Sequence, residues 1–245
     1  MTTDMQHASS HVFDNAGMVA VIMADWFIRV VRDCKEPKVR IALSGGSTPR
    51  QLFEILAQPS AAKEIDWSRV EIFYGDERHV PYDNPDSNHK MAMETLLSKV
   101  PLPPAQIHPI PVSGKVEDDA ASYQETLQKA YGSDVLLPGK PLFELVMLGL
   151  GADGHTASLF PGQDVLNDQK DWVGVARPDT VPHERITLTY PAIASSRLIV
   201  FLVTGDSKVW MLRRLMAGDE TIPSGRITSE GDIVILADRD AAGES

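Results

Sequence analysis

The chain of 245 residues has one cysteine, few aromatic side chains and no excess of positive charge. Because Cys34 stands alone, no disulfide can form within the chain and no thiolate cluster can bind a metal ion, which favours a reducing, cytosolic location. Lys and Arg number 23 against 34 Asp and Glu, so the net charge is −11. This charge repels phosphate backbones and anionic lipids, so we expect neither a nucleic acid nor a membrane as a partner.

Long hydrophobic segments are missing as well. The longest apolar runs, 18–24 and 198–203, are far too short to span a bilayer, and the first residues lack the basic and apolar parts of a secretion signal. Hydrophobic residues make up 43% and charged residues 23% of the chain, fractions that are typical of globular proteins. We therefore predict that residues 1–245 form one cytosolic domain.

Short apolar segments alternate with helical patterns along the chain. Strands are predicted at 39–43, 70–74, 143–148, 172–176, 186–190, 198–203 and 233–236, and helices at 87–99, 117–131 and 207–216. This alternation predicts an α/β fold with a doubly wound, mostly parallel sheet and helices on both faces, similar to a Rossmann fold. Ligands of such sheets bind beyond the carboxyl ends of the strands, so four loops are expected to meet at one site. These loops follow Leu43, Tyr74, Leu148 and Val203.

Both ends of the chain carry a specific expectation. The first helix is predicted to have Asp14 as its N-cap. Its buried face is expected to contain Val19, Ile22, Trp26 and Val30, which recur at spacings of three and four residues. The charged segment 238–245 is expected to be disordered.

The loop after the first apolar strand reads Ser44, Gly45, Gly46, Ser47, Thr48 and Pro49. Its glycines permit positive φ, so that successive N–H groups can turn inward around an anion. The following helix, with Thr48 as expected N-cap and Pro49 as first residue, would direct its positive end to the same place. We predict a phosphate site here. The alternative is an ordinary tight turn, because the loop lacks the Gly-Lys-Ser/Thr ending of a Walker loop.

A second glycine-rich segment, 149–154, formally matches the G-x-G-x-x-G pattern of dinucleotide sites. We reject that interpretation because Pro161 interrupts any following helix, and we predict no cofactor. The backbone at Gly151 is instead expected to approach a small ligand. Asp153 and His155 lie at the tip of the segment, and an imidazole with an ordinary pKa of about 6.5 suits a general base. The alternative is a hydrogen-bonded loop histidine. No His-Glu-x-x-His spacing occurs, so no metal site is predicted.

Charged residues near other strand ends complete the set of candidates. Asp76 and Arg78 follow the second strand, and Arg78 could pair with an oxyanion or with Asp76. Arg185 opens a strand and Lys208 lies at a strand-to-helix junction, where two cations in an acidic protein would suit an anionic substrate. Taken alone, each of these residues is more often an ordinary solvated side chain.

Taken together, segments 44–49, 75–81 and 149–161 closely resemble the 6-phosphogluconolactonase family in order and spacing, as do 185–189 and 204–208. The resemblance implies hydrolysis of 6-phospho-D-glucono-1,5-lactone to 6-phospho-D-gluconate, the second step of the oxidative pentose phosphate pathway. It also implies a fold shared with glucosamine-6-phosphate deaminases. The expected partner is a small sugar-phosphate lactone, and the expected state is a monomer or weak homo-oligomer.

By analogy with the family, His155 would activate water, Arg78 and nearby N–H groups would stabilise the oxyanion, and Asp153 or Asp76 would orient these groups. Gly151 would contact the substrate through its backbone, and a cradle of amides, hydroxyls and two cations would hold the phosphate. The cradle consists of Ser44, Gly45, Gly46, Ser47, Thr48, Arg185 and Lys208.

Two alternatives remain at this point. A sugar-phosphate isomerase or deaminase would carry a glutamate just before the proline, where this chain has Phe160. A catalytically silent sugar-phosphate-binding protein would keep the phosphate cradle without the chemistry.

Overall fold

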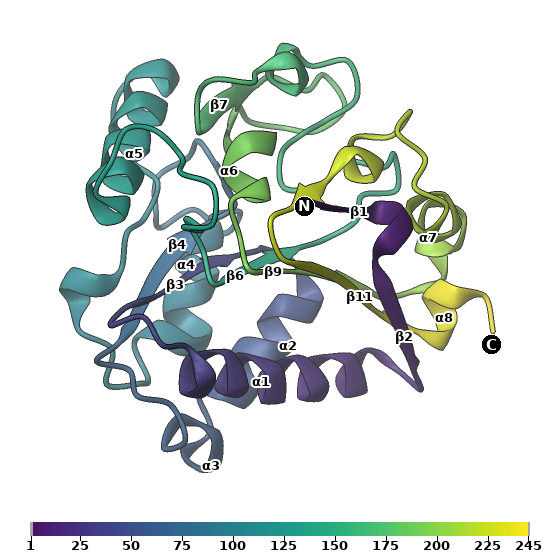
Figure 1. The fold of residues 1–245 in the computed structure, drawn as a ribbon, viewed down its shortest axis with the longest axis horizontal. Coiled ribbons are helices and arrows are strands. Elements are labelled where there is room, and N and C mark those ends of the chain that lie inside the picture. Colours follow the sequence, from purple (N-terminus) through teal and green to yellow (C-terminus); the bar gives the residue numbers. More distant parts are fainter. Residues whose placement is uncertain (1, 245) are drawn as a thin grey trace.

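A six-stranded parallel sheet forms the centre of the computed structural model, which describes residues 2–244 (Figure 1). Its strands run in the order β2, β11, β9, β6, β3, β4, and every neighbouring pair is parallel. The bounds are Ser9–Phe13 (β2), Asp232–Asp238 (β11), Leu198–Val203 (β9), Leu145–Leu148 (β6), Val39–Leu43 (β3) and Val70–Tyr74 (β4). The predicted parallel α/β sheet is therefore confirmed.

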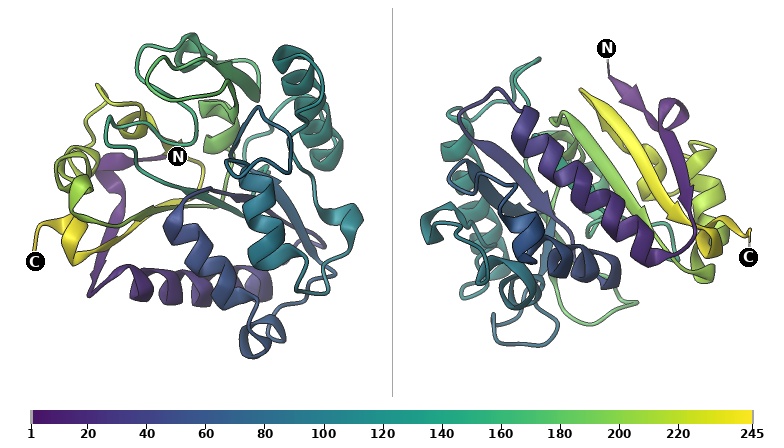
Figure 2. Two further views of the ribbon diagram at one scale, coloured as in Figure 1. Left: turned by 180° about the vertical axis from the view of Figure 1, so that it is seen from behind. Right: turned by 90° about the horizontal axis from the view of Figure 1, so that it is seen from below.

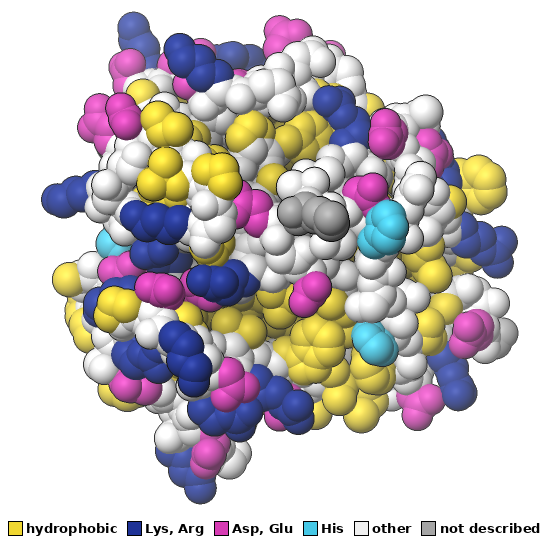
Figure 3. All heavy atoms as spheres, viewed as in Figure 1, with side chains coloured by type: hydrophobic (Ala, Val, Ile, Leu, Met, Phe, Trp, Pro, Cys, Tyr) yellow, Lys and Arg dark blue, Asp and Glu magenta, His cyan; other side chains and the backbone are white. Residues whose placement is uncertain are grey.

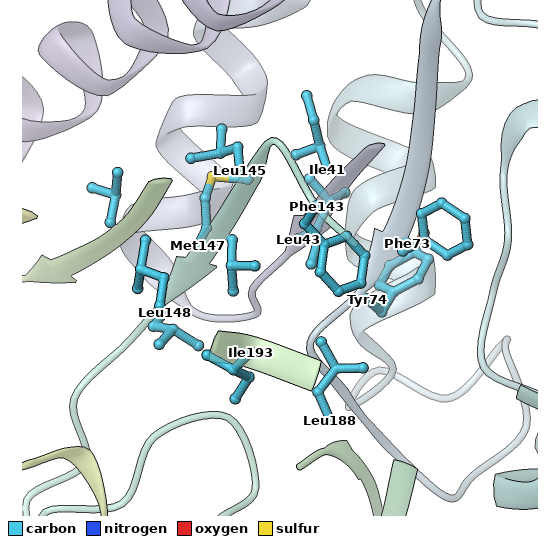
Figure 4. Close-up of a cluster of buried hydrophobic side chains, with 14 of the residues drawn as sticks. Ile41, Leu43, Phe73, Tyr74, Phe143, Leu145, Met147, Leu148, Leu188 and Ile193 are labelled. Atoms are coloured by element: carbon cyan, nitrogen blue, oxygen red, sulfur yellow. The ribbon is translucent and has the colours of Figure 1, made fainter. Parts of the chain in front are cut away.

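The middle strands are apolar because both of their faces are covered. Figure 4 shows Ile41 and Met147 of two middle strands in one cluster of buried side chains with Phe73 of the edge strand β4. Leu188 and Ile193 lie across from them in the layer that covers one face of the sheet.

Helices lie on both sides of the sheet, as expected (Figures 1 and 2). Helices α1 (Ala16–Asp33) and α2 (Ser47–Leu56) lie together on one side. The other side carries α6 (Tyr190–Ala194), α5 (Val116–Tyr131) and a small antiparallel sheet.

The small sheet corrects part of the predicted topology. Its strands are β5 (Asp76–Arg78), β8 (Arg185–Leu188) and β7 (Val173–Ala176), in that order, and β8 is antiparallel to both neighbours. The strands predicted near 172–176 and 186–190 therefore exist but do not extend the parallel sheet. Part of the polar segment after Tyr74, expected to be a loop, is the strand β5. Through β5 the small sheet holds three charged residues, Asp76, Glu77 and Arg78, at the end of the large sheet.

The remaining elements are short. They are β1 (Thr3–Asp4) and β10 (Thr228–Ser229), which pair with each other, α3 (Pro59–Ala62), α4 (Asn88–Ala92), α7 (Val209–Met216) and α8 (Arg239–Ala242). A π-helical turn, Met93–Leu97, continues α4, and 3₁₀ turns occur at Met5–His7, Pro104–Gln106, Asp164–Asn167, Asp206–Lys208 and Pro223–Arg226. Within residues 2–244, no helix has the length and apolar character needed to cross a membrane.

The first helix differs from its prediction at its start and in its buried face. Its N-cap is Asn15, whose side-chain oxygen accepts a hydrogen bond from the Met18 amide at 3.0 Å, and not Asp14. The fully buried stripe runs along Val19, Met23, Phe27 and Val31, with two alanines between them. Of the predicted face only Val19 is buried, because α1 packs against α2 and β11 and turns Ile22, Trp26 and Val30 to the flank of that contact.

The end of the chain is folded where disorder was predicted. Asp238 accepts a hydrogen bond from the Ala241 amide at 2.8 Å and so caps α8, and Ala241 is completely buried. The expectation of disorder is therefore wrong for Arg239–Ala242, because the cap and the buried alanine outweigh the polar composition. Ser245 lies outside the described residues.

Candidate active site

The four predicted loops meet at the carboxyl ends of β3, β4, β6 and β9, around a cleft of about 260 Å³. Eight of the predicted site residues line it: Ser44, Gly45, Gly46, Asp76, Arg78, Gly151, His155 and Lys208. The other four, Ser47, Thr48, Asp153 and Arg185, are not among the lining residues. Sequence reasoning missed Asn88, Gly149, Leu150, Ala152 and Ala157, which also line the cleft.

His155 is held on one wall of the cleft by its own loop. Its Nδ1 lies 2.5 Å from the Asp153 carboxylate, which also accepts a hydrogen bond from the His155 backbone amide at 3.1 Å. Nε2 forms no hydrogen bond with any group of residues 2–244. The contact on Nδ1 therefore holds one edge of the ring and leaves Nε2 available as a proton acceptor.

The Asp153 carboxylate is held in its charged form by this contact. Partial burial acts to raise its pKa, but the hydrogen bonds and the charge of His155 outweigh burial, so the pKa lies below its ordinary value. Gly151 makes room for the ring, because a Cβ at this position would lie 2.1 Å from Nδ1 of His155. A glycine is therefore required here for space.

Asp76 lines the cleft, and two side chains from other elements donate hydrogen bonds to its carboxylate. Its carboxylate accepts the Ser158 hydroxyl at 2.5 Å and the side-chain amide of Asn88 at 3.3 Å. The Asn88 amide also donates to the backbone carbonyl of Asp76 at 3.0 Å. These bonds join α4 and the 149–160 loop to β5. Asn88 carried no sequence signal, because only the fold brings it beside Asp76.

Glu77, the neighbour of Asp76, is a buried carboxylate whose hydrogen bonds hold the backbone of residues around the cleft. It accepts the backbone amides of Asn88 and His89 at 2.7 Å each, and the Arg78 amide at 2.8 Å. Burial raises its pKa despite these hydrogen bonds. Its chemical type gave no hint of this role, because a glutamate in a charged loop is usually solvated. The consequence is that the cleft residues Arg78 and Asn88 are tied to one carboxylate.

The glycine-rich loop leads into α2 two residues earlier than predicted. The helix begins at Ser47, and its N-cap is Gly46 at φ +113°, a conformation that favours glycine. Thr48 is thus inside the helix, where its hydroxyl lies 2.7 Å from that of Thr204. No side chain of residues 2–244 caps α2, so its first amide groups are left for an anion.

The two predicted cations occupy different places. Lys208 lines the cleft, on the turn that follows Gly205 at φ +92°. The Gly205 amide donates to the Asp238 carboxylate at 3.0 Å, which anchors this turn. Arg185 is 5% exposed and pairs with Arg78 across β5 and β8. Its Nη1 donates to the carbonyls of residues 182–184, so it supports the end of the small sheet.

The electrostatics of the cleft differ from those of the chain as a whole. On the face of the molecule in Figure 3, acidic and basic side chains are intermixed. The cleft brings together Arg78, Lys208 and the uncapped start of α2, with Asp76 as the acidic side chain. Arg185, buried on β8 opposite Arg78, is a third cation near the cleft, and burial and the charge of Arg78 lower its pKa from the ordinary value. An anionic ligand is favoured here although the net charge is −11.

Comparisons with known proteins agree with this arrangement. The model of the family described as glucosamine-6-phosphate isomerases/6-phosphogluconolactonase matches residues 14–235. A 6-phosphogluconolactonase of Synechocystis sp. is 40% identical over 205 residues, which cover 82% of each chain. A chloroplastic 6-phosphogluconolactonase of Arabidopsis thaliana is 35% identical over 85% of this chain, which spans 66% of that relative's length.

Solved structures show the same fold. The 6-phosphogluconolactonase of Trypanosoma cruzi superimposes with a TM-score of 0.84 at 27% identity, over 96% of each chain. A monomeric glucosamine-6-phosphate deaminase superimposes with a TM-score of 0.79 at 20% identity, over 97% of this chain and all of that one. At that identity the deaminase supports the fold alone.

Proposed function

Because this chain belongs to the family of glucosamine-6-phosphate isomerases and 6-phosphogluconolactonases, and is an enzyme of its lactone-hydrolysing branch, we propose that its substrate is 6-phospho-D-glucono-1,5-lactone. The product is 6-phospho-D-gluconate, and the reaction is the second step of the oxidative pentose phosphate pathway. The observation that supports this proposal is the cleft itself, which is lined by the imidazole of His155, with no partner on Nε2 among residues 2–244, and by residues of two other loops, Ser44, Gly45, Gly46 and Lys208.

The proposed chemistry begins with His155 as general base. Nε2 takes a proton from a water molecule as the water oxygen bonds to C1 of the lactone. Arg78 and backbone N–H groups stabilise the resulting oxyanion. The bond between C1 and the ring oxygen then breaks, and the imidazolium returns its proton to that oxygen. General-base assistance of this kind contributes roughly 10² to 10⁴ in rate, which suits an activated ester.

The two aspartates have separate parts in this proposal. Asp153 orients the His155 ring and stabilises the imidazolium, because it contacts Nδ1 directly. Asp76 accepts hydrogen bonds from Ser158 and Asn88, which supports a role in shaping the wall beside the substrate.

The phosphate is assigned to the cradle. The amides of Gly45, Gly46 and Ser47 at the uncapped start of α2 would donate to its oxygens, together with the Ser44 hydroxyl and the Lys208 ammonium group. Thr48 contributes its amide, because its hydroxyl already contacts Thr204. Arg185, buried on β8 opposite Arg78, adds positive charge near the cleft.

Nothing at position 160 favours the deaminase alternative. Phe160 is 4% exposed, and its ring packs against His155, so it offers no carboxylate for ring opening or proton shuttling.

The test is a comparison of three compounds. Freshly made 6-phosphogluconolactone should disappear much faster with the protein than without it, the lactone without a phosphate should react with a far higher KM, and glucosamine 6-phosphate should release no ammonia. Ammonia release would identify a deaminase. Saturable binding of 6-phosphogluconate without faster lactone opening would identify a silent sugar-phosphate-binding protein.

A further inference from the structure

We propose that Phe160 is a positioning residue, which holds the imidazole of His155 face-on so that Nε2 points to the substrate. This inference rests on the proposed function, because it assigns a task to a residue that the chemistry itself does not use. Phe160 does not line the cleft. It acts through the ring that does.

The evidence is a contact between Phe160 and the face of the imidazole, beside two contacts at its Nδ1 edge. The ring centroids of His155 and Phe160 are 4.2 Å apart, and the planes are inclined by 31°. Asp153 holds the edge of the imidazole at Nδ1, 2.5 Å away. Gly151 approaches the same edge so closely that a Cβ there would lie 2.1 Å from Nδ1. Edge and face are both supported, while Nε2 remains without a partner among residues 2–244.

The backbone between the two rings turns back on itself to make this contact. The Leu159 amide donates to the Thr156 carbonyl at 2.9 Å, and Ala157 between them has φ +47°, a conformation that an alanine seldom adopts. The Thr156 hydroxyl donates to the Gly149 carbonyl at 2.8 Å, and the Ser158 amide donates to the Thr187 hydroxyl at 3.1 Å. These bonds hold the strained turn, and the turn returns Phe160 to the ring.

The physical effect is on rotation of the imidazole. The ring turns about its Cα–Cβ and Cβ–Cγ bonds, and one hydrogen bond at Nδ1 restrains only one edge, so a flat, buried aromatic ring packed against the face adds a second restraint on this rotation. A misplaced reacting atom is costly, because a displacement of about 1 Å can reduce the rate on the order of 10²-fold.

The first experiment replaces the flat ring by an aliphatic group. In Phe160→Leu we expect kcat to fall on the order of tenfold while KM stays within about twofold, since the cradle is untouched. The matched control is Phe73→Leu. Phe73 stacks on His108 with ring centroids 4.4 Å apart, away from the cleft, so this variant should lose stability and keep kcat.

The second experiment separates charge from shape. Phe160→Glu places a carboxylate beside the imidazole, whereas Phe160→Gln has the same size without charge. The other charged groups around the ring, Asp153 on its own loop and Asp76, Arg78 and Lys208 on the cleft walls, are the same in both variants. The acid limb of the kcat/KM profile should therefore lie about one pH unit higher in the Glu variant than in the Gln variant.

A spectroscopic readout keeps the test independent of turnover. Nitrogen-15 spectra of the histidines should show a single Nδ1–H tautomer for His155 in the wild type and a mixture in Phe160→Leu, each in protein shown to be folded by thermal unfolding. An unchanged His155 spectrum with unchanged kcat in Phe160→Leu would overturn the inference, as would coincident acid limbs for Glu and Gln. If the wild type fails to open the lactone, the proposed function is wrong, and the spectra still decide whether Phe160 orders the ring.

Discussion

The two walls of the cleft are built in different ways. The wall formed by 149–160, here called the catalytic wall, is fixed by side-chain contacts such as that of Asp153 with His155. The wall formed by 44–48 and 204–208, here called the cradle wall, is shaped by the backbone, with Gly46 and Gly205 at positive φ. A base must be placed to within a fraction of an ångström, whereas a phosphate accepts many donors. The difference predicts that changes on the catalytic wall act on kcat and changes on the cradle wall act on KM.

The largest expected effect lies on the catalytic wall. His155→Ala should lower kcat on the order of 10² or more with little change in KM, because the base is removed and the phosphate contacts remain. Kinetic constants on freshly made lactone, corrected for spontaneous hydrolysis, measure this effect. A rise in KM with unchanged kcat would show that His155 contributes to substrate binding and not to the chemical step.

The next effect distinguishes the two aspartates. Asp153→Asn should lower kcat about tenfold or more, because the group on Nδ1 can no longer stabilise the imidazolium. Asp76→Asn, which leaves that contact intact, is the matched comparison and should change kcat less. Equal losses in the two variants would mean that the contact with Nδ1 has no special part.

The contact between Asp153 and His155 also predicts how the stability of the folded chain depends on pH. The pKa of Asp153 is below its ordinary value of 3.8 in the folded chain, so the stabilisation it provides is complete above that value and is lost as the pH falls through the lowered pKa. Urea unfolding at pH 5 and at successive pH values below 3.8 should therefore show that the stability difference between wild type and Asp153→Asn shrinks as the pH falls. A difference that stays constant down to the lowest pH would show that the charged carboxylate does not stabilise the folded chain.

A smaller effect is expected on the cradle wall. Lys208→Ala should raise KM about tenfold with kcat nearly unchanged, because a charge-assisted contact to the phosphate is lost. Lys170, an exposed lysine that is not among the residues lining the cleft, is the control, and Lys170→Ala should leave both constants unchanged. A drop in kcat for the Lys208 variant would show that the walls do not divide the two tasks.

The smallest effect on activity is expected for a buried residue that belongs to neither wall, Tyr123. The Tyr123 hydroxyl accepts the Tyr74 amide at 2.8 Å and donates to the Tyr74 carbonyl at 3.0 Å, at the buried end of β4. Tyr123→Phe leaves both groups without a partner and should lower the free energy of unfolding by about 1 to 3 kcal/mol. Kinetic constants of the folded variant should match the wild type, and a large loss of kcat would indicate that β4 relaxes into the site.

The sequence predicted what depends on local pattern. The strands at 39–43, 70–74 and 198–203 have the expected bounds, because buried parallel strands are short, continuous apolar runs. The meeting of four loops followed from the rule for parallel sheets, and His155, Arg78 and Lys208 were found on those loops.

What the sequence could not predict depends on partners far along the chain. Strand β2 is largely exposed at the edge of the sheet, so its pattern carries no apolar signal. Strand β5 has only three residues, all charged, and exists because β8 pairs with it. Glu77 and Phe160 received no part in the predicted chemistry, since their roles come from contacts with α4 and with the His155 ring.

One measurement tests the central claim most directly: the rate of proton release from a single batch of fresh 6-phosphogluconolactone, followed at constant pH with wild type, with His155→Ala and without protein. The account predicts rapid release with the wild type and a rate close to the spontaneous one with the variant. Equal rates for wild type and variant, both above the spontaneous rate, would show that the lactone is opened without the imidazole. No acceleration by the wild type would contradict the assigned reaction.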